Sequence, residues 1–131
     1  MDQKADQIKK RFGEKLIGSK RLQQLVCETL HIFPQEVINY VTKNVWFVTS
    51  FDDSWGFVLK IDELKSKGKF VIFLGDELWK QDEYARRYEI AHEIGHVILK
   101  HRNAITAPQS KAEVDRQEKE AHQFALKYLK S

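Results

Sequence analysis

The chain lacks several features that would assign it to a protein class at once. It contains one cysteine, Cys27, which excludes a disulfide framework and a metal site built from several thiolates. Its six glycines form neither a phosphate-cradling loop nor a GxSxG nucleophile motif. No apolar run approaches the length that a bilayer requires, and DQKADQIKKRF after Met1 lacks the apolar stretch of a signal peptide. We therefore expect a cytoplasmic protein with no membrane partner.

A large excess of one charge is also absent. The chain has 22 basic and 19 acidic residues, which gives a formal net charge of +3. This excess is too small to predict a nucleic-acid partner, and we interpret the locally basic segment from Lys9 to Arg21 as a solvated face. What the chain does have is ordinary globular composition, 42% hydrophobic and 31% charged over 131 residues. That is enough for one domain with a single core.

The spacing of apolar residues predicts helices in the first third of the chain. An irregular apolar pattern covers residues 2–17. Ser19 is placed to cap a helix over 20–31, and Pro34 suits the first turn of a helix over 34–43.

The middle of the chain has the composition of strands. Residues 45–51, 55–61 and 69–74 are rich in β-branched and aromatic side chains, and Asp52-Asp53-Ser54 is typical of a turn. We expect a small antiparallel sheet of three strands. The order of helices, strands and helices predicts a single α+β domain. This domain is expected to cover residues 1–131. Within it we predict N-terminal helices over about 2–43, a sheet over about 45–74, and helices over about 82–101 and 111–130.

His92-Glu93-Ile94-Gly95-His96 is an HExxH motif within one of these predicted helices. Residues four apart project from one helical face, so the imidazoles of His92 and His96 can converge on one metal ion. Zn²⁺ accepts neutral imidazole nitrogen, and coordination supplies a partner that rings on an apolar helix otherwise lack. Glu93 is rotated by about 100° from His92, off the line of the ligands, where it can act on an attacking water.

The alternative is that these histidines are ordinary core or surface residues. The surrounding helix favours the interpretation of these histidines as metal ligands. It is apolar on two sides, which is typical of a helix central to a fold. One side has Tyr84, Tyr88 and Leu99, and the other has Ile90, Ile94 and Val97. We therefore predict one zinc ion with His92 and His96 among its ligands.

A catalytic zinc usually has three protein ligands. The candidates for the third are Glu118, Glu120, His122 and His101. Periodicity favours Glu118, because it falls within the apolar stripe of the last helix, whereas Glu120 points to the polar side. The stripe comprises Val114, Ala121, Ala125, Tyr128 and Leu129. The simpler account of Glu118 is a stripe-edge carboxylate that reaches water, but an inward carboxylate facing a histidine pair is the better prediction.

His122 follows Glu118 by one helical turn and borders the same stripe. We predict a catalytic role for it, either as a hydrogen-bond partner behind a ligand or as a group that stabilises a transition state. A role for His122 as the third metal ligand, in place of Glu118, is less favoured. His101 lies at a helix end, where a cation favours the local dipole, and we interpret it as structural.

Two stretches resemble the ImmA/IrrE-type metallopeptidases, namely ARRYEIAHEIGHVILKH (85–101) and EKEAHQFALKYL (118–129). FVIFLGDELW (70–79) also resembles the strand and connection that precede the active helix in that family. The resemblance implies a zincin-like, more narrowly gluzincin-like, domain. It also implies that His92, His96 and Glu118 are the zinc ligands and that Glu93 is the catalytic base. His122 stands where the family usually has Asn or Asp, which is a departure within the second motif.

The predicted function is zinc-dependent hydrolysis of a peptide bond in a protein or peptide substrate. Glu93 would take a proton from the attacking water and pass it to the leaving amine. The group that donates a hydrogen bond to the oxyanion is one of His122, Tyr128 and Tyr88, and the sequence does not choose between them. An extended substrate segment is expected to add to an exposed sheet edge. Family members often sit beside helix-turn-helix repressors, so the resemblance implies a regulatory substrate, such as a repressor that controls a mobile element or a stress response.

Two other functions are compatible with the sequence. The first is a non-enzymatic, metal-containing module that binds a helix-turn-helix repressor without cleaving it. The second is DNA binding through the helix pair 20–31 and 34–43. Lys20, Arg21 and Lys43 make a thin basic footprint there, so a plain packing pair is preferred and a nucleic-acid partner is not expected.

Overall fold

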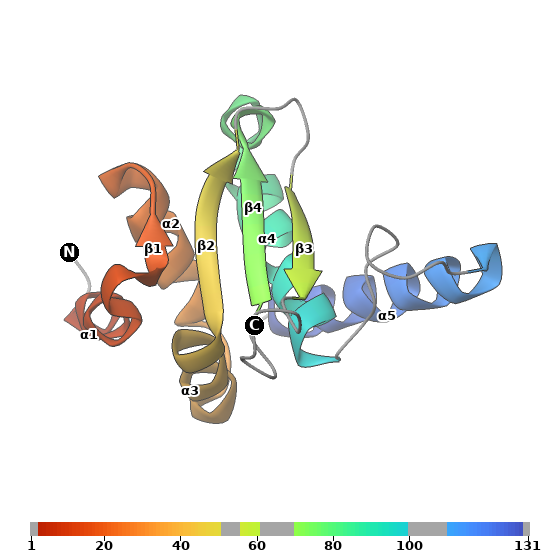
Figure 1. Ribbon diagram of the computed structural model, residues 1–131, viewed down its shortest axis with the longest axis horizontal. Helices are drawn as coiled ribbons and strands as arrows, with labels where there is room; N and C mark the ends of the chain where they lie inside the picture. Colours follow the sequence, from red (N-terminus) through yellow and green to blue (C-terminus); the bar gives the residue numbers. More distant parts are fainter. Residues whose placement is uncertain (1–2, 51–55, 61–69, 100–109, 130–131) are drawn as a thin grey trace.

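The fold is built around a mixed four-stranded sheet, against which helices from both ends of the chain pack (Figure 1). The computed structural model describes residues 3–50, 56–60, 70–99 and 110–129. In spatial order the strands are β1 (Leu16–Ile17), β2 (Val45–Ser50), β4 (Phe70–Gly75) and β3 (Gly56–Lys60). With helices before and after the strands, the arrangement is α+β, as the sequence predicted.

The prediction of an antiparallel, three-stranded sheet is wrong. β1 pairs with β2 and β2 pairs with β4 in parallel, while β3 runs antiparallel beside β4. Although β3 lies between β2 and β4 along the chain, it takes the outer edge, which leaves β4 between two strands. This place suits β4, because Phe70, Ile72 and Leu74 on one of its faces are almost wholly buried. β1 was not predicted, since two residues are too short to show alternation, and the predicted turn at 52–54 lies outside the described residues.

Three helices precede β2 (Figure 1). They are α1 (Gln3–Phe12), α2 (Lys20–Leu30) and α3 (Gln35–Asn44). α1 ends earlier than the predicted residue 17, because Gly13 adopts a positive φ of 60° and the chain turns through η1 (Gly13–Lys15) into β1. The Oγ of Ser19 accepts the backbone N–H of Leu22 at 3.1 Å, so this serine caps α2 as expected. Pro34 directly precedes α3.

These helices turn apolar faces toward the sheet and toward each other. The fully buried members of this core include Phe12, Val26, Leu30, Ile38, Val41 and Phe47. The ring of Phe12 on α1 meets the ring of Phe47 on β2 edge to face, with centroids 5.7 Å apart. Burying such side chains stabilises the fold by about 1.5–3 kcal/mol each. The core therefore ties the N-terminal helices to β2 and so to the rest of the sheet.

α4 (Glu83–Ile98) and α5 (Lys111–Leu129) follow the sheet and η2 (Asp76–Lys80). The Oδ1 of Asp82 accepts the N–H of Ala85 at 2.8 Å, so an aspartate caps α4. α4 packs against β3, α2 and α5, and Figure 1 shows it passing behind β4 and β3. Among the helices of the described ranges, none is long and apolar enough to cross a membrane.

The predicted burial of α4 on two sides is wrong for one of them. Ile90, Ile94 and Val97 are fully buried, whereas Tyr84 is 55% exposed and Leu99 is 42% exposed. Tyr84 stands two turns before His92 on the same side of the helix. That side is therefore the open one, and it carries the histidines of the motif.

Candidate metal centre

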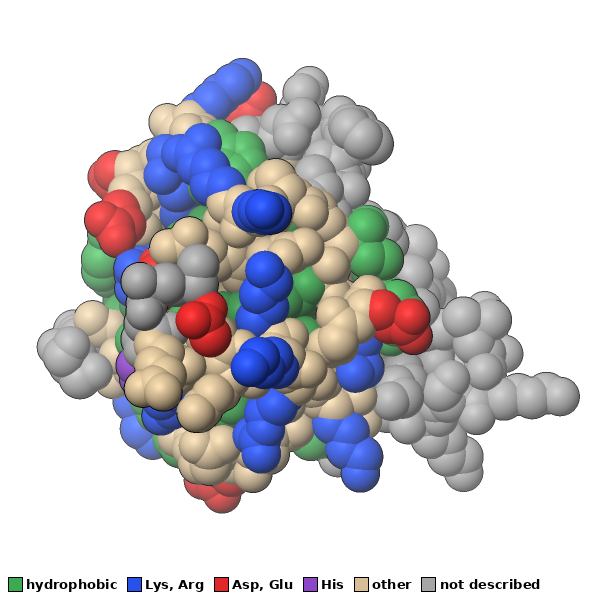
Figure 2. Space-filling view, turned by 90° about the vertical axis from the view of Figure 1, so that its left-hand side faces the viewer, with side chains coloured by type: hydrophobic (Ala, Val, Ile, Leu, Met, Phe, Trp, Pro, Cys, Tyr) green, Lys and Arg blue, Asp and Glu red, His purple; other side chains and the backbone are tan. Residues whose placement is uncertain are grey.

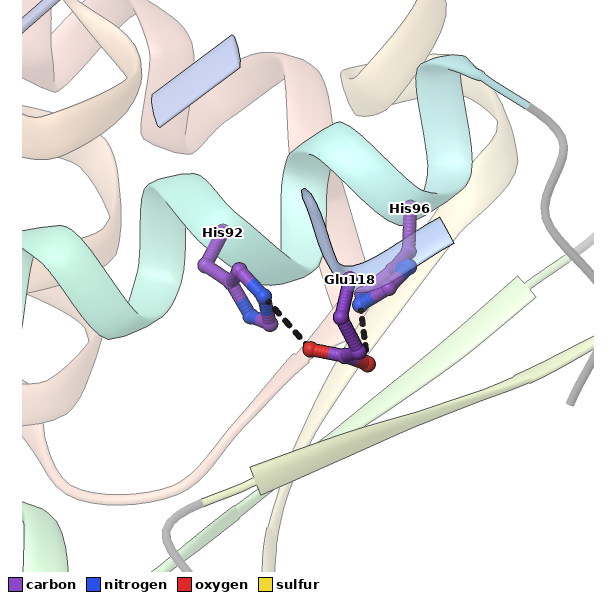
Figure 3. A group of neighbouring side chains, drawn as sticks. All are labelled: His92, His96 and Glu118. Atoms are coloured by element: carbon purple, nitrogen blue, oxygen red, sulfur yellow. Dashed lines mark ion pairs between the residues drawn. The ribbon is translucent and has the colours of Figure 1, made fainter. Parts of the chain in front are cut away.

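Three side chains from two helices converge at one point (Figure 3). The Nε2 of His92 lies 3.0 Å from Oε2 of Glu118, and the Nε2 of His96 lies 3.1 Å from Oε1 of the same carboxylate. His92 and His96 come from α4 and Glu118 from α5. One donor atom of each residue lies within 4.8 Å of the other two, so a single ion could contact all three.

Small residues allow the two helices to approach closely enough for this. Gly95 lies on α4 between the two histidines, and a Cβ added there would stand 3.0 Å from Cδ1 of Phe124 and 3.3 Å from Cα of Ala121. Ala121 is itself fully buried. Because Glu118 lies one turn before Ala121, the close contact at Gly95 brings its carboxylate over the histidine pair.

The donor set fits a divalent transition-metal ion. Each oxygen of the Glu118 carboxylate faces one Nε2, so without a metal both rings must place a proton on Nε2 to make these contacts. When Nε2 of each ring is deprotonated, the two nitrogen lone pairs and the carboxylate point at a common centre. Two imidazoles and a carboxylate adopt this arrangement around such an ion. The histidine side chains are 13% exposed while Glu118 is 55% exposed. The centre is therefore desolvated on the α4 side and open to solvent on the α5 side.

Glu93 is buried next to the metal centre but is not part of the converging set. Its Oε1 lies 3.6 Å from Nδ1 of His92, on the side of the ring away from Glu118. That distance is longer than a hydrogen bond, and Nδ1 of His92 is a buried atom without a hydrogen-bond partner. Burial acts to lower the pKa of His92, but the Glu93 carboxylate beside it raises the pKa, and the charges of Glu118 and Glu89 add to the rise. The net pKa of His92 is raised.

Glu89 is a member of the site that the sequence reading missed. Donor atoms of Glu89, His92 and Glu93 lie within 4.8 Å of one another. Burial, followed by the charge and the hydrogen bond of Glu93, raises the pKa of Glu89 to about 8. At neutral pH the Glu89 carboxyl is therefore protonated and donates to Glu93. Its position four residues before Glu93, one helical turn away, could have identified it.

Tyr88 and His122 form a hydrogen-bonded pair across α4 and α5. The Tyr88 hydroxyl lies 2.6 Å from Nδ1 of His122, and the Tyr88 ring stacks on His92 with centroids 5.8 Å apart. Burial, then the charges of Glu89 and Glu118, raises the pKa of Tyr88, which keeps its hydroxyl protonated and able to donate to Nδ1. In the tautomer in which Nδ1 accepts this hydrogen bond, the ring proton of His122 lies on Nε2. The sequence named both residues as candidates but could not pair them.

The other predicted candidates lie elsewhere. Tyr128 packs its ring against Phe33 and Phe124, with centroids 4.9 Å and 5.1 Å away. Glu120 pairs with Arg116 at 3.0 Å on the polar side of α5, as expected. His101 falls outside the described residues.

An HExxH helix crossed by a second helix with an opposing carboxylate, beside a small sheet, defines a metallopeptidase-like domain. The family model of the IrrE N-terminal-like domain, a peptidase family, matches residues 61–129, which is just over half of the chain and includes α4 and α5. The chain belongs to this family, so the resemblance read from the two motifs is confirmed. No curated protein and no solved structure gives a significant match.

Proposed function

We propose that the protein is a zinc-dependent endopeptidase with a zincin-like, gluzincin-type site that hydrolyses a peptide bond in a protein substrate. The observation that carries this proposal is the convergence of His92, His96 and Glu118 within 4.8 Å in a member of a peptidase family. These three residues would hold the ion. When bound, zinc supplies Lewis acidity, which makes a water molecule more acidic and stabilises negative charge on a carbonyl oxygen.

Glu93 is the proposed general base. It is the buried carboxylate nearest the histidine pair that does not belong to the converging set. It takes a proton from the attacking water as the new C–O bond forms, and it gives that proton to the leaving nitrogen as the C–N bond breaks. The hydrogen bond from protonated Glu89 holds the Glu93 carboxylate in the site in the absence of substrate.

His122 is the proposed donor to the oxyanion. Tyr88 donates to its Nδ1, which fixes the tautomer with the proton on Nε2, and its position one turn after Glu118 keeps it on the side of α5 that faces the site. A donor held in this way needs no reorganisation when negative charge develops on the substrate. Tyr88 acts through His122 and so has a positioning role.

An extended segment of the substrate is proposed to pair with β3. Of the two outer strands in the order β1-β2-β4-β3, β3 is the one that packs against α4. A segment added at the free edge of β3 would run beside the helix that carries His92 and His96. The substrate we favour is a regulator such as a helix-turn-helix repressor of a mobile element or stress response, on the strength of the family membership.

The test is Glu93→Gln, which keeps the shape of the side chain but removes the base. We expect the variant to bind one zinc per chain, measured by elemental analysis, and to lose about 10²–10⁴-fold in the rate of cleavage of a candidate helix-turn-helix repressor. Glu120→Gln is the matched control, since this glutamate pairs with Arg116 away from the site. Cleavage by Glu93→Gln at the rate of the control would contradict the proposal.

A non-enzymatic regulatory module is the second candidate function. The position of Glu93 favours it, because the carboxylate faces Nδ1 of His92 rather than the side where Glu118 lies. Such a module would bind the repressor in a fixed ratio in the presence of zinc without cleaving it. Mass spectrometry of the repressor after incubation separates the two functions, since only the endopeptidase yields shorter fragments.

A further inference from the structure

A groove between α1 and α3 carries a dense set of cations. It consists of two hollows of about 380 Å³ and 350 Å³ that share Arg11, and we refer to them together as the α1–α3 groove. The first is lined by Lys4, Gln7, Ile8, Lys10, Arg11, Gln35 and Ile38. The second is lined by Arg11, Lys15, Asn39, Thr42 and Lys43.

The charge in this groove is of one sign. Four lysines and Arg11 line it, and none of the described residues that line either hollow is acidic. Figure 2 shows Lys and Arg side chains following one another down the face to which α1 belongs. Concentrated like charge is unfavourable for the isolated fold, so it is usually found where an oppositely charged partner binds.

Arg11 is held in position at the centre of the groove. Its guanidinium reaches from α1 to donate to Oδ1 of Asn39 on α3, and Asn39 also accepts from Nε2 of Gln35 at 2.9 Å. This contact fixes the side chain across the groove and uses one of its five N–H donors. A guanidinium held in this way matches the two oxygens of a carboxylate with little further loss of side-chain entropy.

The shape of the groove indicates what kind of anion it fits. Its cations come from α1, η1 and α3 and border two hollows that open to solvent, the second of them shallow. Side-chain carboxylates on an extended segment can enter such a groove. The phosphates of duplex DNA lie on a broad convex surface and would meet a ridge of cations more readily than a groove. Amide side chains of Gln7 and Gln35 among the cations add hydrogen-bond partners that a peptide can use.

We propose that the α1–α3 groove is a docking site for an acidic segment of a protein partner. The groove is built from α1, η1 and α3, whereas the metal centre is built from α4 and α5. Docking therefore does not require the metal or the reaction, and it stands even if the proposed peptidase activity fails. Where the partner is also a substrate, the groove holds it at a place separate from the site of cleavage.

Binding of a fluorescein-labelled twelve-residue oligoglutamate to the full chain tests this proposal. Fluorescence anisotropy at low ionic strength is measured for the wild type, for Lys10→Glu with Lys15→Glu, and for Lys111→Glu with Lys127→Glu. The last pair is the matched control, because it changes the net charge equally on exposed positions of α5. Circular dichroism confirms that each variant is folded.

We expect the oligoglutamate to bind the wild type with an affinity that falls as salt rises. The groove variant should bind about tenfold more weakly or worse, while the α5 variant should stay within about twofold of the wild type. Equal weakening in both variants would show that only net charge matters and would overturn the proposal. Absence of binding to the wild type would overturn it as well, as would tighter, groove-dependent binding of a random DNA duplex of similar charge.

Discussion

Glu89 illustrates how one neighbour changes the chemistry of a single residue. Alone on a helix it would be an ordinary ionised carboxylate, but here it is partly buried beside Glu93. Two carboxyl groups that lie this near to each other cannot both be ionised at low cost, so one proton is retained between them. Helical spacing predicts that Glu89 and Glu93 are neighbours, whereas the burial that raises the pKa depends on what packs over them.

Glu89→Gln is expected to change how the stability of the metal-free protein depends on pH. Well below pH 4.5, Glu89 is protonated in both the folded and the unfolded chain, so its contribution to stability is fully present. As pH rises toward about 8, the unfolded chain ionises at this residue first, and the free energy of unfolding falls. Glutamine stays neutral and keeps a donor for Glu93, so this loss should disappear in the variant.

Urea unfolding in the presence of a chelator measures the effect. At pH 8 Glu89→Gln should be more stable than the wild type by on the order of 1–3 kcal/mol, with little difference near pH 4.5. Glu120→Gln, which alters an exposed ion pair, should follow the wild type at both values. Parallel pH profiles for the wild type and Glu89→Gln would contradict the shared proton.

The crossing of α4 and α5 is the element on which the metal centre depends. Helix propensity alone argues against a glycine at position 95, because glycine costs about 1 kcal/mol relative to alanine in a helix interior. The contact with Phe124 and Ala121 explains it, since any Cβ at this position meets atoms at 3.0–3.3 Å. Two of these are backbone atoms of α5, which can give way only if the whole helix moves.

Gly95→Val should therefore separate the two helices and weaken metal binding. The expected cost is about 1–3 kcal/mol in the free energy of unfolding, from overpacking at the crossing. Zinc affinity should fall with it, because Glu118 moves away from the histidines. Isothermal titration calorimetry with zinc measures the affinity, and Ala112→Val, at an exposed position on α5, is the control. Unchanged zinc affinity in Gly95→Val would show that the close crossing does not position Glu118.

At the scale of the whole molecule, a metal ion bound at this site would link two helices that lie apart in the sequence. α4 packs on the sheet and on α2, whereas α5 packs mainly on α4. An ion held by His92, His96 and Glu118 would add a bond between these helices that the unfolded chain lacks. Folding and metal binding should then be coupled.

Zinc is expected to raise the free energy of unfolding by about 2.7 kcal/mol when its free concentration is 100 times the dissociation constant. Thermal unfolding with zinc and with a chelator measures this shift. Glu118→Ala should lose most of the shift, while Glu113→Ala on the same helix should retain it. A wild type whose melting temperature is the same with zinc and with the chelator would argue against a metal centre.

The sequence by itself determined the features that depend on residues close together along the chain. Ser19 and Asp82 cap their helices because their side chains reach backbone N–H groups three residues on. The HExxH spacing likewise puts His92 and His96 on one side of α4, since helical geometry is local. Family membership followed from the same motifs.

Only the tertiary structure decided which distant elements meet. β3 lies outside β4 rather than between β2 and β4, because strands compete for pairing with both edges of the buried β4, and that competition involves the whole sheet. The pairing of Tyr88 with His122 and the charge gathered in the α1–α3 groove depend in the same way on how helices pack. Packing is settled by the sum of many weak contacts between residues far apart in sequence, which no local pattern records.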